Sequence, residues 1–150
     1  MKNTLLLMSL LALPCMAGFD GFTEESYGDG RFLKTKFTTS GSGEFHLGCG
    51  LGTDNKLFTI IGLRHPVFYQ LNGAYYANLS IDEKDKTAIY GGTRQYDDMY
   101  YAKNPSSELL KQIRVGNTVN VNFSNQNLQF SLTESNQAYT ELLAECRLKD

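Results

Sequence analysis

The stretch VNVNF-SNQN-LQFSL, residues 119–132, decides the fold class of this chain. Apolar residues alternate with polar ones on both sides of the tetrad SNQN, and Asn and Ser are typical turn residues. Alternation with a period of two residues is the pattern of a strand that is buried on one face. The stretch therefore predicts a β-hairpin, the clearest one in the sequence.

Further strands are predicted upstream, from the same alternation or from continuous apolar runs, over residues 31–37, 45–51, 57–63, 77–81, 88–90 and 99–102. In the first of them, Lys34 and Lys36 fall on the face that we expect to be wet. In the second, Cys49 falls on the apolar face and His46 on the opposite one, where a surface or rim position is expected. The third is apolar throughout, which indicates a central strand or one buried on both faces.

Two short helices complete the predicted elements. Asn104 can cap a helix in which Pro105 takes the first position and which Gly116 ends. Ser135 can cap a second helix, in which apolar residues and Cys146 recur every four positions. The expected fold class is β-rich α+β: a single antiparallel β-sandwich or partly open barrel with two short helices.

The first 17 residues have the pattern of a secretory signal peptide. A basic start precedes an apolar run that is too short to span a membrane, and Cys15 and Ala17 are small residues at the positions that signal cleavage before Gly18 requires. We expect export to the periplasm or the medium. The alternatives are a buried N-terminal helix and a lipoprotein signal with Cys15 as the lipid acceptor, against which Pro14 argues. No other segment is apolar enough to be a membrane span.

Residues 18–30 are Gly-rich and acidic, and they predict a loose arm or a weakly held edge. Residues 31–150 then form a single β-rich domain, because the remaining length suits one hydrophobic core. The formal net charge of the whole chain is −2, without a basic block, so nucleic acid is not an expected partner.

Cys49 and Cys146 are the cysteines that remain after signal cleavage. In an oxidising compartment, two distant cysteines favour a disulfide over free thiols. Both fall on apolar faces by independent periodicities, so the bond would tie the C-terminal helix to the sheet. Closing so long a loop contributes about 4–5 kcal/mol in the chain-entropy account. Zinc binding is not predicted, because the spacing is wide and neither His is grouped with the pair.

A family resemblance is carried by the C-terminal third: SELLKQIRVG (107–116), VNV (119–121), FSL (130–132), Ala138 and Cys146. It resembles small exported bacterial β-domains, namely type VI secretion accessory proteins of the TagO/VasI type and, more distantly, invasion-associated locus B-like proteins. In these, a short helix, a hairpin ending in Phe-x-Leu and an Ala-containing helix closed by Cys recur together. The chain departs from them in lacking Trp and an early Cys pair, and in carrying Glu134-Ser135 where a Gly-containing turn is usual. The resemblance implies fold and compartment, and no active site.

No pattern of catalytic, cofactor-binding or metal-ligating residues emerges, and we predict a protein that is not an enzyme and needs no cofactor. The carboxylates considered as a pair for glycoside hydrolysis fall in turns beside Lys and Arg, where solvated charge is the ordinary explanation. These are Asp82, Glu83, Asp85, Asp97 and Asp98.

Tyrosines are concentrated between positions 69 and 101, which hold seven of the nine. Tyr and Arg are favoured at binding faces because they combine contact area with a polar tip. Tyrosines also fill strand rims in exported β-proteins, so a purely structural role for them stays an alternative. The candidate partner-binding residues are Tyr75, Tyr76, Arg94, Tyr96, Tyr100 and Tyr101.

These observations favour a non-catalytic binding or accessory protein of the envelope, with a protein or a cell-wall component as its partner. One alternative is a periplasmic inhibitor or immunity protein against a cell-wall hydrolase. The stretch SGSGEF (40–45) resembles the Ser-Gly-rich loop that periplasmic lysozyme inhibitors insert into a cleft. Another is a small envelope hydrolase with an unrecognised site. Ionisable groups converging in a cleft would indicate the enzyme, and an exposed aromatic patch the binder.

Overall fold

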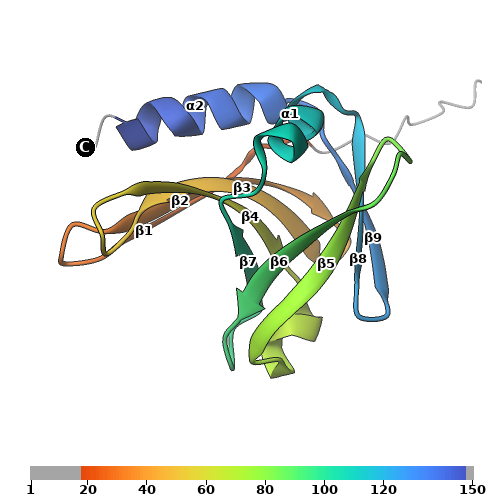
Figure 1. The fold of residues 1–150 in the computed structure, drawn as a ribbon, viewed down its shortest axis with the longest axis horizontal. Helices are drawn as coiled ribbons and strands as arrows, with labels where there is room; N and C mark the ends of the chain where they lie inside the picture. Colours follow the sequence, from red (N-terminus) through yellow and green to blue (C-terminus); the bar gives the residue numbers. More distant parts are fainter. Residues whose placement is uncertain (1–17, 148–150) are drawn as a thin grey trace, which may run out of the picture.

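The computed structural model describes residues 18–147, so the predicted signal peptide (residues 1–17), with Cys15, lies outside the described residues. The described strands form one nine-stranded sheet in the order β1-β2-β3-β4-β7-β6-β5-β8-β9, and every recorded pairing is antiparallel (Figure 1). The strands are β1 (Gly21–Ser26), β2 (Phe32–Ser40), β3 (Gly43–Leu51), β4 (Leu57–Arg64), β5 (Gly73–Ile81), β6 (Thr87–Thr93), β7 (Met99–Lys103), β8 (Thr118–Phe123) and β9 (Gln126–Ser131). The helices are η1 (Pro66–Gln70), α1 (Ser107–Val115) and α2 (Ser135–Arg147).

The sheet coils strongly without closing, so it is a partly open barrel, as the sequence predicts. Its last strand, β9, comes to lie beside β2 and β3 without pairing to either. Gly43, at the start of β3, is buried there, and a Cβ built on it would lie 3.2 Å from the Phe130 ring of β9. The coil turns one face of the sheet inward, and α2 lies across β2 and β3 (Figure 1).

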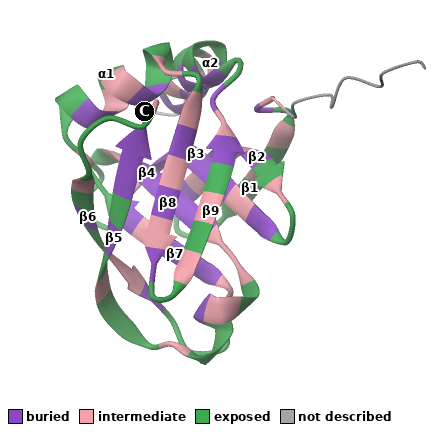
Figure 2. Cartoon of the chain, turned by 90° about the vertical axis from the view of Figure 1, so that its right-hand side faces the viewer, coloured by how far each residue is buried: buried purple, intermediate pink, exposed green. Residues whose placement is uncertain are grey.

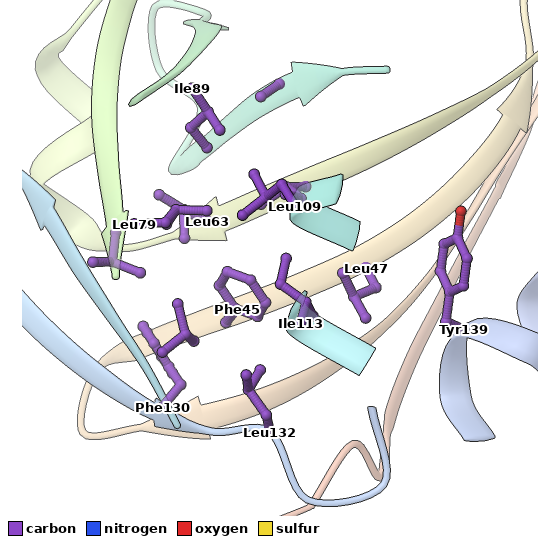
Figure 3. Close-up of a cluster of buried hydrophobic side chains, with 14 of the residues drawn as sticks. Phe45, Leu47, Leu63, Leu79, Ile89, Leu109, Ile113, Phe130, Leu132 and Tyr139 are labelled. Carbon is purple, nitrogen blue, oxygen red and sulfur yellow. The ribbon is translucent and has the colours of Figure 1, made fainter. Parts of the chain in front are cut away.

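The inner face holds the hydrophobic core, to which every strand from β2 to β9 contributes. Figure 3 shows Phe45, Leu63 and Phe130 converging with Ile113 of α1. All four side chains are at most 1% exposed. Figure 2 shows the matching alternation along β8, where buried residues alternate with half-buried ones. The predicted hairpin is confirmed as β8 and β9, joined by the two-residue turn Ser124-Asn125.

The helices form where the sequence predicts, with different residues at their starts. Ser106, and not Asn104, caps α1: its side chain accepts a hydrogen bond from the Leu109 N–H. Asn104 instead accepts the N–H of Thr59. Ser135 is the first residue of α2, and its buried hydroxyl donates to the Ile113 carbonyl of α1. The Ser135 bond therefore joins the start of α2 to α1.

The predicted disulfide is confirmed. Cys49 of β3 and Cys146 of α2 are bonded, with their Cα atoms 6.4 Å apart, and both are almost fully buried. The bond ties the C-terminal helix to the sheet across 97 residues of chain.

The structure corrects the expectation that Lys34 and Lys36 lie on a solvent-exposed face of β2. Lys34 and Lys36 point toward α2, where Lys34 lies 3.0 Å from Glu145 and Lys36 pairs with Glu141. Lys34 is consequently only 8% exposed. The sequence pattern shows alternation but not which side a helix from the far end of the chain will cover. The long lysine side chains reach along the inner face to acidic partners at the helix surface.

Residues 18–30 contain β1, which is an edge strand of the sheet and pairs with β2 along its whole length. Among the described residues, no helix has the length and apolar character needed to span a membrane.

Candidate functional site

A groove of about 540 Å³ lies on the outer face of the sheet, where β6 and β7 meet. We call it the outer groove. It is lined by Leu33, Phe58, Ile60, Ala74, Tyr90, Gly91, Gly92, Thr93, Arg94, Tyr101 and Lys103. These residues come from β2, β4, β5, β6 and β7 and from the first position after β6, so the groove joins segments that are far apart in sequence.

The groove exists because β6 and β7 diverge. The two strands pair only through Gly92 with Tyr101 and Thr93 with Tyr100, whereas β5 and β6 pair over seven positions. At the crossing, a Cβ on Gly91 would lie 2.4 Å from the Tyr101 carbonyl oxygen. Only glycine allows the two backbones to approach so closely there.

Small residues form the floor of the groove. Alternation along β6 places Tyr90 and Gly92 on the outer face, with Arg94 continuing that side just beyond the strand. A Cβ on Gly92 would meet nothing closer than the Gly73 carbonyl oxygen at 3.5 Å, and its neighbour on β5 is Ala74. The space that larger side chains would fill is therefore open to a ligand.

Aromatic rings and cations form the walls. Tyr90 is 59% exposed, and its ring lies 4.8 Å from that of Tyr76. The Lys103 ammonium lies over the Phe58 ring at 4.6 Å, a cation–π contact. Arg94 and Lys103 are the charged residues that line the groove, and both are exposed.

Tyr101 lies at the centre of this wall and is half-buried. Burial, and next the charges of Glu25 and Asp97, raise the pKa of Tyr101 to about 12. The phenol therefore stays neutral and keeps its O–H as a hydrogen-bond donor at any physiological pH. Neither Glu25 nor Asp97 lines the groove.

The predicted contact residues divide into three groups. Arg94 and Tyr101 line the groove, and Tyr76 adjoins it through Tyr90. Tyr96 is 71% exposed and stands apart from the groove lining, with its ring 6.0 Å from that of Tyr69 of η1. Tyr96 lies in the loop between β6 and β7.

Tyr75 and Tyr100 belong to the interior. Tyr75 is half-buried and packs edge-on against Phe123. Tyr100 is 0% exposed, which corrects its expected place on a contact surface. Its hydroxyl donates to the Tyr75 and Ile89 carbonyl oxygens, at 3.0 and 3.2 Å. Neighbours on a strand face opposite ways, so Tyr101 cannot point outward unless Tyr100 points inward.

The structure also corrects the predicted position of His46. The residue is fully buried and does not lie at the surface or at a rim. Its Nε2 lies 2.7 Å from a Glu44 carboxylate oxygen and its Nδ1 lies 2.9 Å from the Thr35 hydroxyl. Its ring stacks on Phe37, and it pairs with Gly62 of β4, which leaves room for the ring. Burial lowers the pKa of His46 to about 4, so the imidazole is neutral.

This arrangement of hydroxyl, imidazole and carboxylate has the order of a hydrolytic triad. Thr35, which would be the nucleophile, is 1% exposed and also bonds to the Thr23 hydroxyl at 2.6 Å. No substrate reaches it in this structure. The network holds β1, β2 and β3 together.

Three of the acidic residues singled out from the sequence have structural partners. Asp82 accepts the N–H groups of Asn117 and Thr118, which lowers its pKa. Asp97 accepts the Met99 N–H, and Asp98 pairs with Arg64 at 3.2 Å. Within residues 18–147, no three His, Cys, Asp or Glu side chains gather as a metal site would require.

The Ser-Gly stretch is the tight β2–β3 turn. Gly43 is buried under β9, and the aromatic residue that follows, Phe45, is 0% exposed in the core. The turn therefore presents no aromatic side chain for insertion into a cleft.

Comparison with known proteins finds a fold relative. A crystal structure of invasion associated protein B from Bartonella henselae is similar, with a TM-score of 0.51 and 16% sequence identity, covering 83% of this chain and 99% of that one. At this identity the likeness shows the fold alone, in line with the invasion-associated locus B part of the sequence resemblance. The resemblance to type VI secretion accessory proteins stays a prediction. No family profile and no curated protein matches the sequence.

Proposed function

We propose that the chain is an exported envelope protein that binds a protein or cell-wall partner through the outer groove, without catalysis. The observation that carries this is the make-up of the groove. Tyr90 and Tyr101 stand beside Arg94 and Lys103 over a floor of small residues. Tyr and Arg are the residues that most often dominate binding energy at protein interfaces.

The chemistry of the lining supports binding over catalysis. General acid–base catalysis needs a group that exchanges a proton near neutral pH, usually an imidazole or a carboxyl group. Neither kind lines the outer groove. The imidazole–carboxylate pair that the structure does contain, His46 with Glu44, is held in the buried network. The lining of the outer groove thus offers no general acid or base of the kind that a hydrolase uses.

The disulfide supports the proposed compartment. A buried bond between Cys49 and Cys146 is typical of proteins that fold in an oxidising environment such as the periplasm. An inhibitor or immunity protein would also act by binding a partner without catalysis, so this alternative belongs to the same functional class. The tight, partly buried β2–β3 turn does not favour loop insertion as its mechanism.

The test fills the groove without changing the fold. Gly92→Leu places a side chain over the open floor, and Ala88→Leu adds the same side chain to an exposed β6 residue outside the groove. Residues 18–150 of each version are immobilised and exposed to an envelope extract and to purified cell-wall sacculi. We expect material that the wild type and Ala88→Leu retain and that Gly92→Leu loses. Retention that is the same for all three, or none at all, would contradict the proposal.

A further inference from the structure

We propose that the outer groove binds an extended peptide segment of a partner protein, with the pattern acidic–x–apolar–x–acidic. This inference rests on the proposed function and names the chemistry of its ligand. Three features of the groove carry it: the spacing of its two cations, the hollow between them, and the hydrogen-bonding character of its lining.

The two cations stand at opposite ends of the groove. Gly92 and Tyr101 are paired across β6 and β7, which run antiparallel. Arg94 lies two residues beyond Gly92, and Lys103 lies two residues beyond Tyr101 in the opposite direction. Along the strands, the two are thus separated by four residue steps, or about 13 Å.

An extended peptide has the same repeat as the strands. Its residues i and i+4 lie on one side, about 13 Å apart, with residue i+2 between them on that side. Acidic side chains at i and i+4 would therefore reach Lys103 and Arg94 while residue i+2 faces Gly92 and Tyr101. Both lining charges are positive, whereas the whole chain carries a net charge of −2, so the groove is a local site for anions.

The hollow between the cations suits an apolar side chain. Its floor is Gly92 and Ala74, and Ile60 and Phe58 contribute apolar walls. Ile60 is almost fully covered, so the half-buried Phe58 ring and the exposed Tyr90 ring offer the apolar surface on which a ligand side chain would be shielded from water. The middle position of the ligand is therefore Leu-like or Phe-like.

The lining also distinguishes this ligand from a sugar. Hydroxyl-rich ligands need acceptors as well as donors, yet no Asp, Glu, Asn or Gln side chain lines the groove. Arg94 and Lys103 can only donate, which matches carboxylates. A glycan carrying carboxylates would satisfy the cations but would leave the apolar hollow unfilled.

The chain itself places an acidic residue beside the groove, because Glu25 of β1 is paired with Leu33, which lines the groove. Glu25, Tyr27 and Asp29 alternate through the end of β1 and the turn that follows. A hydrogen bond to Glu25 raises the pKa of Tyr27, and Arg94 lies close enough to lower it. Because Glu25 lies beside the groove, its negative charge opposes an acidic ligand, and Glu25→Gln should tighten binding.

The experiment measures fluorescence anisotropy of short labelled peptides with the wild-type protein. Three peptides are compared. The first carries Glu-Ser-Leu-Ser-Glu, the second has Lys in place of both Glu residues, and the third has Ser in place of the central Leu. We expect the acidic peptide to bind best, and loss of the central Leu to weaken it about tenfold. In Arg94→Glu/Lys103→Glu, the acidic peptide should bind at least about tenfold more weakly and the Lys peptide should bind instead. Ala88→Leu should behave as the wild type and Gly92→Leu should bind neither.

The outcomes distinguish failure of the peptide assignment from failure of the proposed function. Equal binding of acidic and basic peptides, or no exchange of preference on charge reversal, overturns the peptide assignment. Tighter binding of an acidic glycan than of the acidic peptide also overturns it. If Gly92→Leu abolishes binding of that glycan, the groove is still the binding site, and only the class of ligand is wrong. If Gly92→Leu removes no retained envelope material, the proposed function has failed.

Discussion

Gly92 of β6 is paired with Tyr101 of β7 at the point where the two strands begin to diverge. The pair sets a residue without a side chain opposite an outward-facing phenol, on the convex side of a strongly coiled sheet. One partner supplies the space of the outer groove and the other supplies its central wall. The site is thus a consequence of how the sheet bends.

The crossing of β6 and β7 depends on Gly91. Gly91→Ala would press its methyl group against the Tyr101 carbonyl, and we expect a loss of about 2 kcal/mol in the free energy of unfolding. Gly92→Ala is the matched control, because its Cβ has room, and should stay within about 0.5 kcal/mol of the wild type. Urea denaturation of both variants measures the difference. Equal stabilities would show that the close approach is not needed.

Substitution of a buried tyrosine should affect stability, whereas substitution of an exposed tyrosine in the groove should affect binding. Tyr100→Phe removes a hydroxyl that satisfies two buried carbonyls and should lower the free energy of unfolding by about 1–2 kcal/mol, with partner binding unchanged. Tyr90→Ala should weaken binding by about 2 kcal/mol and cost less than about 1 kcal/mol of stability. Thermal melts paired with binding titrations test both. The reverse pattern would place the contact surface elsewhere.

Local patterns were enough to predict much of the fold. The β8–β9 hairpin, the central strand β4 and the inward orientation of both cysteines follow from periodicity within single segments.

Features that depend on distant packing were not predictable in this way. The period-two pattern of β2 was recognised, but only α2 decides that Lys34 faces Glu145. The burial of His46 depends on Gly62 from the next strand and on Phe37 stacking over it. For the site, the tyrosine-rich stretch includes the β6 and β7 residues that line the proposed groove. The hollow was not predicted, because it is made by Gly92 and Ala74, whose lack of a large side chain gives no signal of a site in the sequence.

The neutral imidazole in the buried network makes stability depend on pH. Because burial depresses the pKa of His46 from 6.5 to about 4, the unfolded chain takes up a proton at a higher pH than the folded one. This contribution is fully present above pH 6.5 and is lost as the pH falls toward 4. We expect a loss of about 2 kcal/mol between pH 7 and pH 5.

Chemical denaturation at a series of pH values measures this loss. His46→Gln, which does not titrate, should flatten the curve over that range, whatever its effect on stability at pH 7. An unchanged slope in the variant would assign the pH dependence to other groups. Asp29, Asp82 and Glu141, whose pKa values are lowered by their hydrogen bonds, act mainly at more acidic pH.

Removing the disulfide should destabilise the protein strongly. The bond closes a loop of 97 residues, for which the chain-entropy account gives about 4 kcal/mol. Cys49→Ala/Cys146→Ala should therefore lower the free energy of unfolding by about that amount, and reduction of the wild type should do the same. Denaturant midpoints with and without reductant provide the measurement. Equal midpoints would mean that the attachment of α2 relies on packing and ion pairs alone.

The central claim, that the outer groove is the binding site, is tested most directly by hydrogen–deuterium exchange of residues 18–150 with and without the bound partner or acidic peptide. We predict slower amide exchange in residues 90–94 and 101–103, while α2 and the β8–β9 turn keep their free rates. Protection confined to η1 and residues 95–98, where Tyr69 meets Tyr96, would contradict the claim.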